Sequence, residues 1–146
     1  MSEIRKIEQG RAAKAFECIS NHERKEKVKG KGKGNLKEYK SYVKKLPMLI
    51  KVNGLGPSIA FVYSKKQKVV AYEWLYNDIV CWIKESPYLY YVKDKFNGEL
   101  VDDIINLNSQ QYRAVTKEVL AFLNWLKRFA DGKILDKEDS NDAKKE

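Results

Sequence analysis

Long apolar runs are missing from this chain of 146 residues. No run approaches the roughly 18–20 consecutive apolar residues that a membrane-spanning helix needs. Residues 1–10 also lack the apolar core of a secretory signal peptide. We therefore expect neither a membrane span nor a secretory signal.

Cysteine and histidine are scarce, with Cys18, Cys81 and His22 as the whole supply. Both cysteines lie in segments of apolar periodicity, which is typical of reduced core thiols in an intracellular, cytoplasmic protein. Cys18 and His22 are four residues apart, a spacing that can place two metal ligands on one helix face, and Cys81 could supply a third. A closed structural zinc site needs four ligands. We expect no metal and no cofactor.

Acidic residues are also in the minority, since 29 Lys and Arg stand against 20 Asp and Glu and give a net charge of +9. Residues 131–146 hold four Lys and six Asp or Glu, so the excess positive charge belongs to the rest of the chain. A basic balance favours an anionic partner, most often nucleic acid. The alternative is a Lys-rich surface that only keeps the protein in solution.

Strand patterns are scarce: residues 88–98 could form one short strand, but a single strand cannot form a sheet. Elsewhere, apolar residues recur at the steps of three and four that mark helices. We expect an all-α fold, a compact single-domain bundle of about six helices. Residues 1–130 form this domain and residues 131–146 a charged, disordered tail. The expected helices are 3–21, 36–52, 57–66, 69–85, 99–107 and 110–130.

Two segments break the helical periodicity. Residues 22–35 hold three Gly and six Lys or Arg, and we expect a flexible basic loop there, although a first helix extending to Lys29 is the alternative. Residues 88–98 are rich in tyrosine, and we expect an aromatic loop packed on the bundle.

The segment 36–57 combines a core face, a basic face and a corner. The core face is formed by Leu36, Tyr39, Val43, Leu46 and Ile50. Pro47 predicts a kink or a break near residues 45–46, because proline removes one backbone hydrogen bond. Gly54 suits a helix cap with positive φ, and Pro57 suits the first position of the next helix.

Lysines on the other face of this helix are the candidate nucleic-acid contacts. A helix spaces them about a turn apart, and such contacts to phosphates bind without reading the sequence. A solvated helix face is the alternative, and for the two cations of the last helix the alternative is a favourable interaction with its dipole. The candidate contact residues are Lys37, Lys40, Lys44, Lys45, Lys51, Lys127 and Arg128.

Two further groups of residues have side chains that can act in catalysis, cation binding or base stacking. Glu99, Asp102 and Asp103 resemble an acidic pair or a cation site, but no base or Gly-rich loop accompanies them, so we expect a solvated helix face and no enzyme activity. The aromatic residues can include a stacking platform for bases, although we expect the three tryptophans in the core. The aromatic candidates are Trp74, Trp82, Trp125, Tyr88, Tyr90, Tyr91 and Phe96.

Two blocks of the sequence resemble the small α-helical subunit of the Cmr complex, the type III-B CRISPR RNA-guided effector. The first block comprises Tyr42-Val43-Lys44-Lys45-Leu46-Pro47, then Asn53-Gly54-Leu55-Gly56 and Ala60-Phe61. The second comprises Tyr112-Arg113, Thr116-Lys117-Glu118 and the stretch LAFLNWLKRFA at 120–130. One departure is Pro57, where the family commonly has Gln.

The resemblance implies a non-catalytic, all-α subunit that stacks in several copies beside the backbone subunits of the complex. Its basic face would line the channel in which guide RNA and target RNA pair, and no membrane or small-molecule substrate is implied. There are three alternatives: a free-standing, sequence-independent nucleic-acid-binding protein, an enzyme, and a scaffold that touches only protein. Association with sister subunits and guide RNA would distinguish the Cmr subunit from these three alternatives.

Overall fold

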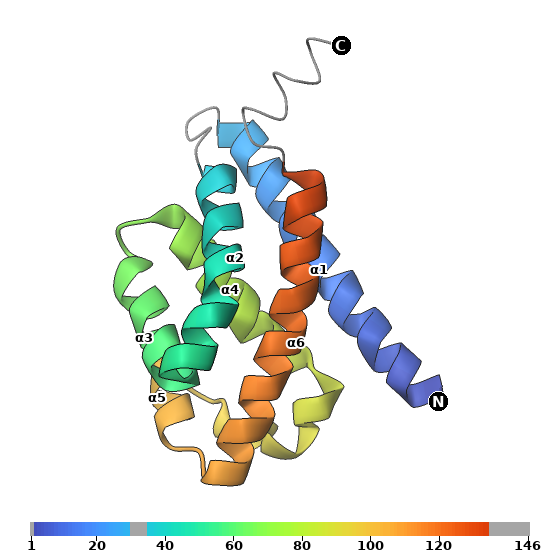
Figure 1. The fold of residues 1–146 in the computed structure, drawn as a ribbon, viewed down its shortest axis with the longest axis vertical. Coiled ribbons are helices and arrows are strands. Elements are labelled where there is room, and N and C mark those ends of the chain that lie inside the picture. The colour runs from blue at the N-terminus through green and yellow to red at the C-terminus, as the bar shows by residue number, and fades with distance from the viewer. Residues whose placement is uncertain (1, 30–34, 135–146) are drawn as a thin grey trace.

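The computed structural model describes residues 2–29 and 35–134, and every regular element in this part of the chain is helical (Figure 1). This confirms the expected all-α fold. Six α-helices and one 3₁₀-helix follow in the order α1 (Ser2–Lys29), α2 (Asn35–Asn53), α3 (Leu55–Lys65), α4 (Val70–Glu85), η1 (Pro87–Lys95), α5 (Leu100–Ile105) and α6 (Ser109–Lys133).

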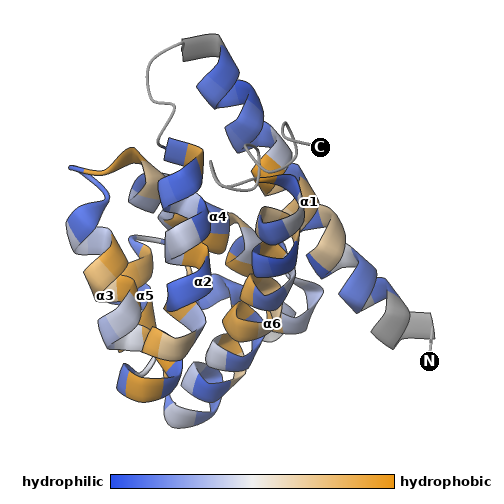
Figure 2. Ribbon diagram, turned by 45° about the horizontal axis from the view of Figure 1, so that its top comes forward, coloured by the Kyte–Doolittle hydropathy of each residue, from blue (hydrophilic) through white to orange (hydrophobic). Residues whose placement is uncertain are grey.

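Helix α6 packs against both α1 and α2, and α4 packs against α2 and α3 (Figure 1). Helix α3 forms one flank of the bundle, and the first turns of α1 project beyond the opposite flank. The hydropathy colouring shows α1 as mostly hydrophilic and α3 as mostly hydrophobic (Figure 2). Helix α1 therefore needs more than apolar contact to hold its place.

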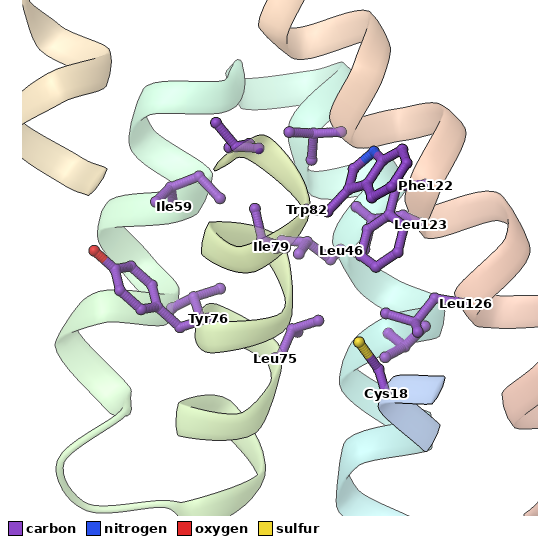
Figure 3. Packing of buried hydrophobic residues seen from close by; sticks show 14 of the residues in the cluster. Cys18, Leu46, Ile59, Leu75, Tyr76, Ile79, Trp82, Phe122, Leu123 and Leu126 are labelled. Carbon is purple, nitrogen blue, oxygen red and sulfur yellow. The ribbon is translucent and has the colours of Figure 1, made fainter. Parts of the chain in front are cut away.

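The apolar core takes buried side chains from all six α-helices and from η1, and Figure 3 shows part of it. The expected core face of α2 is confirmed, since Tyr39, Val43, Leu46 and Ile50 are buried and Leu36 packs against them. The Trp82 ring stacks on Phe122 with centroids 5.5 Å apart. Burying one large apolar side chain contributes roughly 1.5–3 kcal/mol, so this core supplies the main stabilisation of the fold.

The corner between α2 and α3 depends on Gly54. Its φ is 93° and its ψ is 163°, a region that is almost exclusive to glycine. The positive φ expected here is confirmed. The Gly54 N–H donates to the Ile50 carbonyl at 2.8 Å, and the Gly56 N–H donates to the Tyr112 hydroxyl of α6 at 2.8 Å. The corner is thus closed locally and also joined to the last helix.

Both prolines of this region lie within helices. Helix α2 runs without a break through Pro47, so the break that we considered there does not occur. Pro57 is the third residue of α3 rather than the first. The first four N–H groups of a helix have no intrahelical acceptor, so proline costs no hydrogen bond at that position. Pro57 is therefore compatible with the start of α3 directly after the corner.

The ends of the first and last helices differ from the sequence-based expectation. Helix α1 continues to Lys29, so residues 22–29 are helical and not part of a loop; residues 30–34 lie outside the described residues. Helix α6 continues through Gly132 to Lys133, and Ile134 is buried, so the tail cannot begin at 131; residues 135–146 lie outside the described residues. Tertiary contacts override the weak local signals at both ends.

The segment between α4 and α6 follows the expected outline more closely. Ser86 ends α4, and η1 replaces the expected aromatic loop with 3₁₀ turns that bury Leu89 and Val92 in the core. Helix α6 starts with a capping box in which Asn108 is the N-cap. The Asn108 side chain accepts from the Gln111 N–H at 2.8 Å, and the Gln111 side chain accepts from the Asn108 N–H at 3.0 Å.

A buried carboxylate fixes α1 to the bundle. Glu118 of α6 is 3% exposed, and the Arg11 guanidinium donates to it from Nε at 3.0 Å and from Nη2 at 2.7 Å. Trp82 Nε1 donates to the same carboxylate at 2.9 Å, and the Ser86 hydroxyl donates at 3.2 Å. The hydrogen bonds to Glu118 raise the pKa of Arg11 above its usual value. Four donors from three residues thus satisfy one buried charge, and we call this group the Glu118 cluster.

A second polar cluster lies further along α1. His22 Nε2 lies 2.7 Å from Asp78 Oδ2, and the Tyr39 hydroxyl donates to the same oxygen at 2.6 Å. The His22 ring stacks on Trp74 with centroids 4.6 Å apart. Burial, reinforced by the Asp78 charge, raises the pKa of Tyr39 well above its usual value. His22 therefore joins α1 to α2 and α4, which explains why the helix does not end at residue 21.

Replacing Gly54 with alanine should lower the free energy of unfolding by about 1–3 kcal/mol, because an L-residue is strained at this φ and ψ. A Cβ there would also lie 3.3 Å from the Tyr112 hydroxyl. The matched control is Gly132→Ala, since Gly132 is helical and a Cβ there meets nothing within 4 Å. The control should stabilise the protein by about 0.5–1 kcal/mol. Urea unfolding measures both, and equal effects of the two substitutions would contradict this account.

Replacing Glu118 with alanine should cost about 3 kcal/mol, because it leaves a largely buried guanidinium without its main partner. Glu85→Ala is the matched control: it removes an exposed carboxylate that pairs with Lys14 of α1 at 3.2 Å, and should cost under about 1 kcal/mol. Guanidinium chloride unfolding compares the two. A Glu118→Ala variant no less stable than Glu85→Ala would show that the Glu118 cluster does not hold α1.

Candidate nucleic-acid interface

The outer face of α2 presents exposed lysines in a regular row. Lys37, Lys44 and Lys51 follow one another at intervals of seven residues, which in an α-helix is about 10.5 Å along one side. Lys45 is exposed beside this row. Glu38 is the one acidic residue of α2. These four lysines, which we call the α2 row, therefore form a strip of positive charge along the helix.

Lys40 does not belong to the α2 row. The sequence pattern placed it on the solvent side, but it is 6% exposed and its Nζ donates to the Ile134 carbonyl at 2.8 Å. The physical reason is that α6 packs on that side of α2 and leaves a backbone carbonyl there to be satisfied. Its ammonium group therefore serves the end of α6 in this structure.

The outer face of α6 extends the strip. Lys127 and Arg128 are exposed, as expected, and so are Arg113 and Lys117, which the sequence analysis did not select. Asp131 is the one exposed acidic residue of α6, and it lies 3.3 Å from Lys44 Nζ. We call Arg113, Lys117, Lys127 and Arg128 the α6 row. The sequence could have pointed to Arg113 and Lys117 as well, because all four residues lie off the apolar stripe of this helix.

The two helices that carry these rows, α2 and α6, are neighbours in the bundle (Figure 1). The Lys44–Asp131 pair connects them directly. Other cations of the described residues are engaged elsewhere: Arg11 in the Glu118 cluster, Lys14 with Glu85, and Lys133 with Glu23 at 2.9 Å. Further exposed cations, among them Lys65, Lys68 and Lys84, lie outside α2 and α6, so these two helices carry part of the exposed positive charge.

The aromatic candidates separate into core and surface. Trp74, Trp82 and Phe96 are buried, which confirms the core role expected for these tryptophans, and Trp125 is partly buried with its Nε1 donating to Glu8 at 2.8 Å. Tyr88 and Tyr90 of η1 are 44% and 74% exposed. The side chain of Tyr91 lies outside what the structure describes. Of these candidates, Tyr88 and Tyr90 thus remain as possible stacking residues in the described part of the chain.

A groove opens where α1, η1 and α6 meet. Its volume is about 370 Å³, and its lining comprises Arg11, Tyr88, Leu89, Ala114, Lys117 and Glu118. The Arg11 guanidinium lies 4.9 Å from the centroid of the Tyr88 ring. The groove therefore combines a phenol ring and a guanidinium with one residue of the α6 row.

The candidate metal and acidic residues are dispersed. Cys18 is buried near Asp78, whereas Cys81 is exposed. Burial raises the pKa of the Cys18 thiol, which disfavours a thiolate ligand. Glu99 accepts from the Tyr76 hydroxyl at 2.5 Å, and Asp103 accepts from the Gly98 N–H at 3.2 Å. Among residues 2–29 and 35–134, no three His, Cys, Asp or Glu side chains are grouped to hold a metal ion.

In the described ranges, no helix combines the length and the apolar character that crossing a membrane requires. The fold and the two rows define a small all-α protein with exposed cations on α2 and α6. Sequence comparisons place it more narrowly. The family model of the CRISPR-associated protein Cmr5 (Cas_Cmr5) matches residues 7–133.

A curated relative agrees with this match. The CRISPR system Cmr subunit Cmr5 of Thermus thermophilus is 34% identical over 123 residues, which cover 84% of this chain and 91% of that protein. The chain belongs to the Cmr5 family of CRISPR-associated proteins. The resemblance carried by the two sequence blocks is thereby confirmed.

Replacing Lys40 with methionine should cost about 1–2 kcal/mol of unfolding free energy, because a charged hydrogen bond to a buried carbonyl is lost. Lys37→Met is the matched control on the same helix and should change stability by under about 0.5 kcal/mol, since Lys37 is exposed. Thermal unfolding followed by circular dichroism measures both. Equal destabilisation by the two substitutions would contradict the separate roles assigned to these lysines.

Proposed function

We propose that this chain is the non-catalytic small subunit of a type III-B CRISPR RNA-guided complex. In this proposal several copies stack into a filament beside the backbone subunits. The α2 and α6 rows face the channel that holds guide RNA and target RNA. The function is antiviral defence, and cleavage of RNA belongs to other subunits.

Family membership supports the assembly part of this proposal. The match runs over most of the chain and over nearly all of the curated relative, whose name is that of a Cmr subunit. The two sequence blocks on which the resemblance depends meet in the fold, because the Gly56 N–H of the first donates to the Tyr112 hydroxyl of the second. The resemblance therefore reflects one shared structural unit.

The α2 and α6 rows carry the RNA part of the proposal. Eight exposed cations lie on two neighbouring helices, and the acidic residues on the exposed surface of the same helices are Glu38 and Asp131. Lysines and arginines that neutralise phosphates release counterions and bind without sequence preference. A single copy should bind with a Kd of roughly 10⁻⁴–10⁻⁶ M, and several copies along one strand should bind far more tightly.

The assembly part is tested by purifying the tagged full-length protein from its host. We expect sister Cmr subunits and guide RNA to accompany it at constant ratios. Recovery of the protein alone, together with tight RNA binding by that lone protein, would favour a free-standing nucleic-acid-binding protein. Recovery with other Cmr subunits but without RNA crosslinks to α2 or α6 would favour a scaffold that touches only protein.

The RNA part is tested by reversing three charges of the α2 row, Lys37→Glu, Lys44→Glu and Lys51→Glu together. Binding of a single-stranded RNA oligonucleotide should fall at least about tenfold, and the slope of log K against log salt should decrease by about 2, because each phosphate contact contributes about 0.7.

The matched control reverses three exposed lysines outside α2 and α6: Lys65, Lys68 and Lys84. It changes the net charge by the same amount, so it measures the general electrostatic effect. Equal losses in the two triple variants would show that net charge, and not the α2 row, determines RNA binding.

A further inference from the structure

The groove between α1, η1 and α6 has a distinctive distribution of charge. Inside it, the Arg11 guanidinium is neutralised by Glu118, which it contacts at 2.7 and 3.0 Å, and it also bonds to Glu8. At its edge, Lys117 is exposed and forms no ion pair with another residue of the described ranges. Among the lining residues, the charges of Arg11 and Glu118 therefore offset each other, whereas Lys117 makes the mouth cationic.

The lining of the groove offers planar surfaces. The Tyr88 ring is about half exposed, and the guanidinium of Arg11 lies 4.9 Å from its centroid. The Glu118 cluster holds this guanidinium in place from the side of α6. Aromatic rings and arginine planes are the groups on which unpaired bases stack in proteins that bind single strands. The volume of about 370 Å³ lies in the usual range of sites for small organic groups.

The groove is also continuous with the α6 row. Lys117 belongs to both, and Arg113 lies one helical turn away from it on the same outer face. A strand whose phosphates follow the α6 row therefore passes the mouth of the groove. A free anion would be attracted to the mouth but would find no net positive charge inside.

We propose that this groove receives one unpaired base of a single-stranded RNA whose phosphates lie along the α6 row. The base stacks against Tyr88 and Arg11, and Lys117 binds the adjacent phosphate. This inference rests on the proposed function, to which it adds a base-binding site on the side of α6 that faces α1 and η1. The site recognises any base, because stacking needs only a flat ring.

The first experiment tests the groove with a single nucleotide, so that RNA binding along the α2 and α6 rows does not contribute to the signal. The full-length ¹⁵N-labelled protein is titrated with uridine 5′-monophosphate, and separately with ribose 5-phosphate, which lacks the base. Both probes are taken to millimolar concentration. We expect the amides of Leu89 and Ala114, which take no part in the phosphate contact, to shift with the nucleotide and to stay in place with the sugar phosphate. Equal shifts with both probes, or none with either, would overturn the inference.

The second experiment measures binding of a single-stranded RNA oligonucleotide to variants of η1. Tyr88→Leu should weaken binding between about 5- and 150-fold, the range found when a stacking ring is removed. Tyr88→Phe should bind like the unaltered protein, since the ring is retained. Tyr90→Leu is the matched control, because Tyr90 lies in the same 3₁₀-helix and is more exposed but does not line the groove.

The two experiments together separate this inference from the proposed function. RNA binding that is equally strong in Tyr88→Leu and Tyr90→Leu would overturn base binding in the groove, but would leave the proposed role of the α2 and α6 rows unchanged. Nucleotide shifts at the groove without any RNA binding by the chain or its complex would overturn the rows and leave the groove. If thermal unfolding shows Tyr88→Leu to be misfolded, the nucleotide titration of the unaltered protein decides alone.

Discussion

The buried carboxylate of Glu118 is the constraint on which the rest of this structure depends. It accepts hydrogen bonds from Arg11 of α1, from Trp82 of α4 and from Ser86 at the end of α4. Helix α1 is mostly hydrophilic, so apolar burial alone holds it weakly, and an ionic contact with fixed geometry compensates for this. The same contact neutralises Arg11 and sets the charge inside the groove.

The proposed RNA-binding surface follows from how the fold distributes its cations. Arg11, Lys14, Lys40 and Lys133 are used to join helices, through carboxylates or backbone carbonyls. The cations of the α2 and α6 rows remain at the solvent side of two neighbouring helices. Net charge therefore says little about the interface until the structural cations have been separated from the exposed ones.

The sequence was sufficient for features that depend on local periodicity. The core face of α2, the positive φ of Gly54 and the end of α4 at Ser86 all follow from residue type and spacing. The sequence was insufficient wherever the burial or the helical state of a residue depends on a partner far away in the chain. The burial of Lys40 depends on a carbonyl 94 residues away, and the helical state of residues 22–29 is supported by the contact of His22 with Asp78, 56 residues away. The groove could not be anticipated for the same reason, because its lining comes from α1, η1 and α6 and no single segment carries its pattern.

The bond between the Gly56 N–H and the Tyr112 hydroxyl has a consequence for the order of folding. The first turn of α3 has an unsatisfied donor until α6 arrives, although 56 residues separate the two partners in the chain. The full set of hydrogen bonds at the α2–α3 corner is therefore complete only when the C-terminal helix has docked. Slow closure of such non-local contacts couples the two ends of the domain into one cooperative unit, so the corner should exchange its amide hydrogens together with α6.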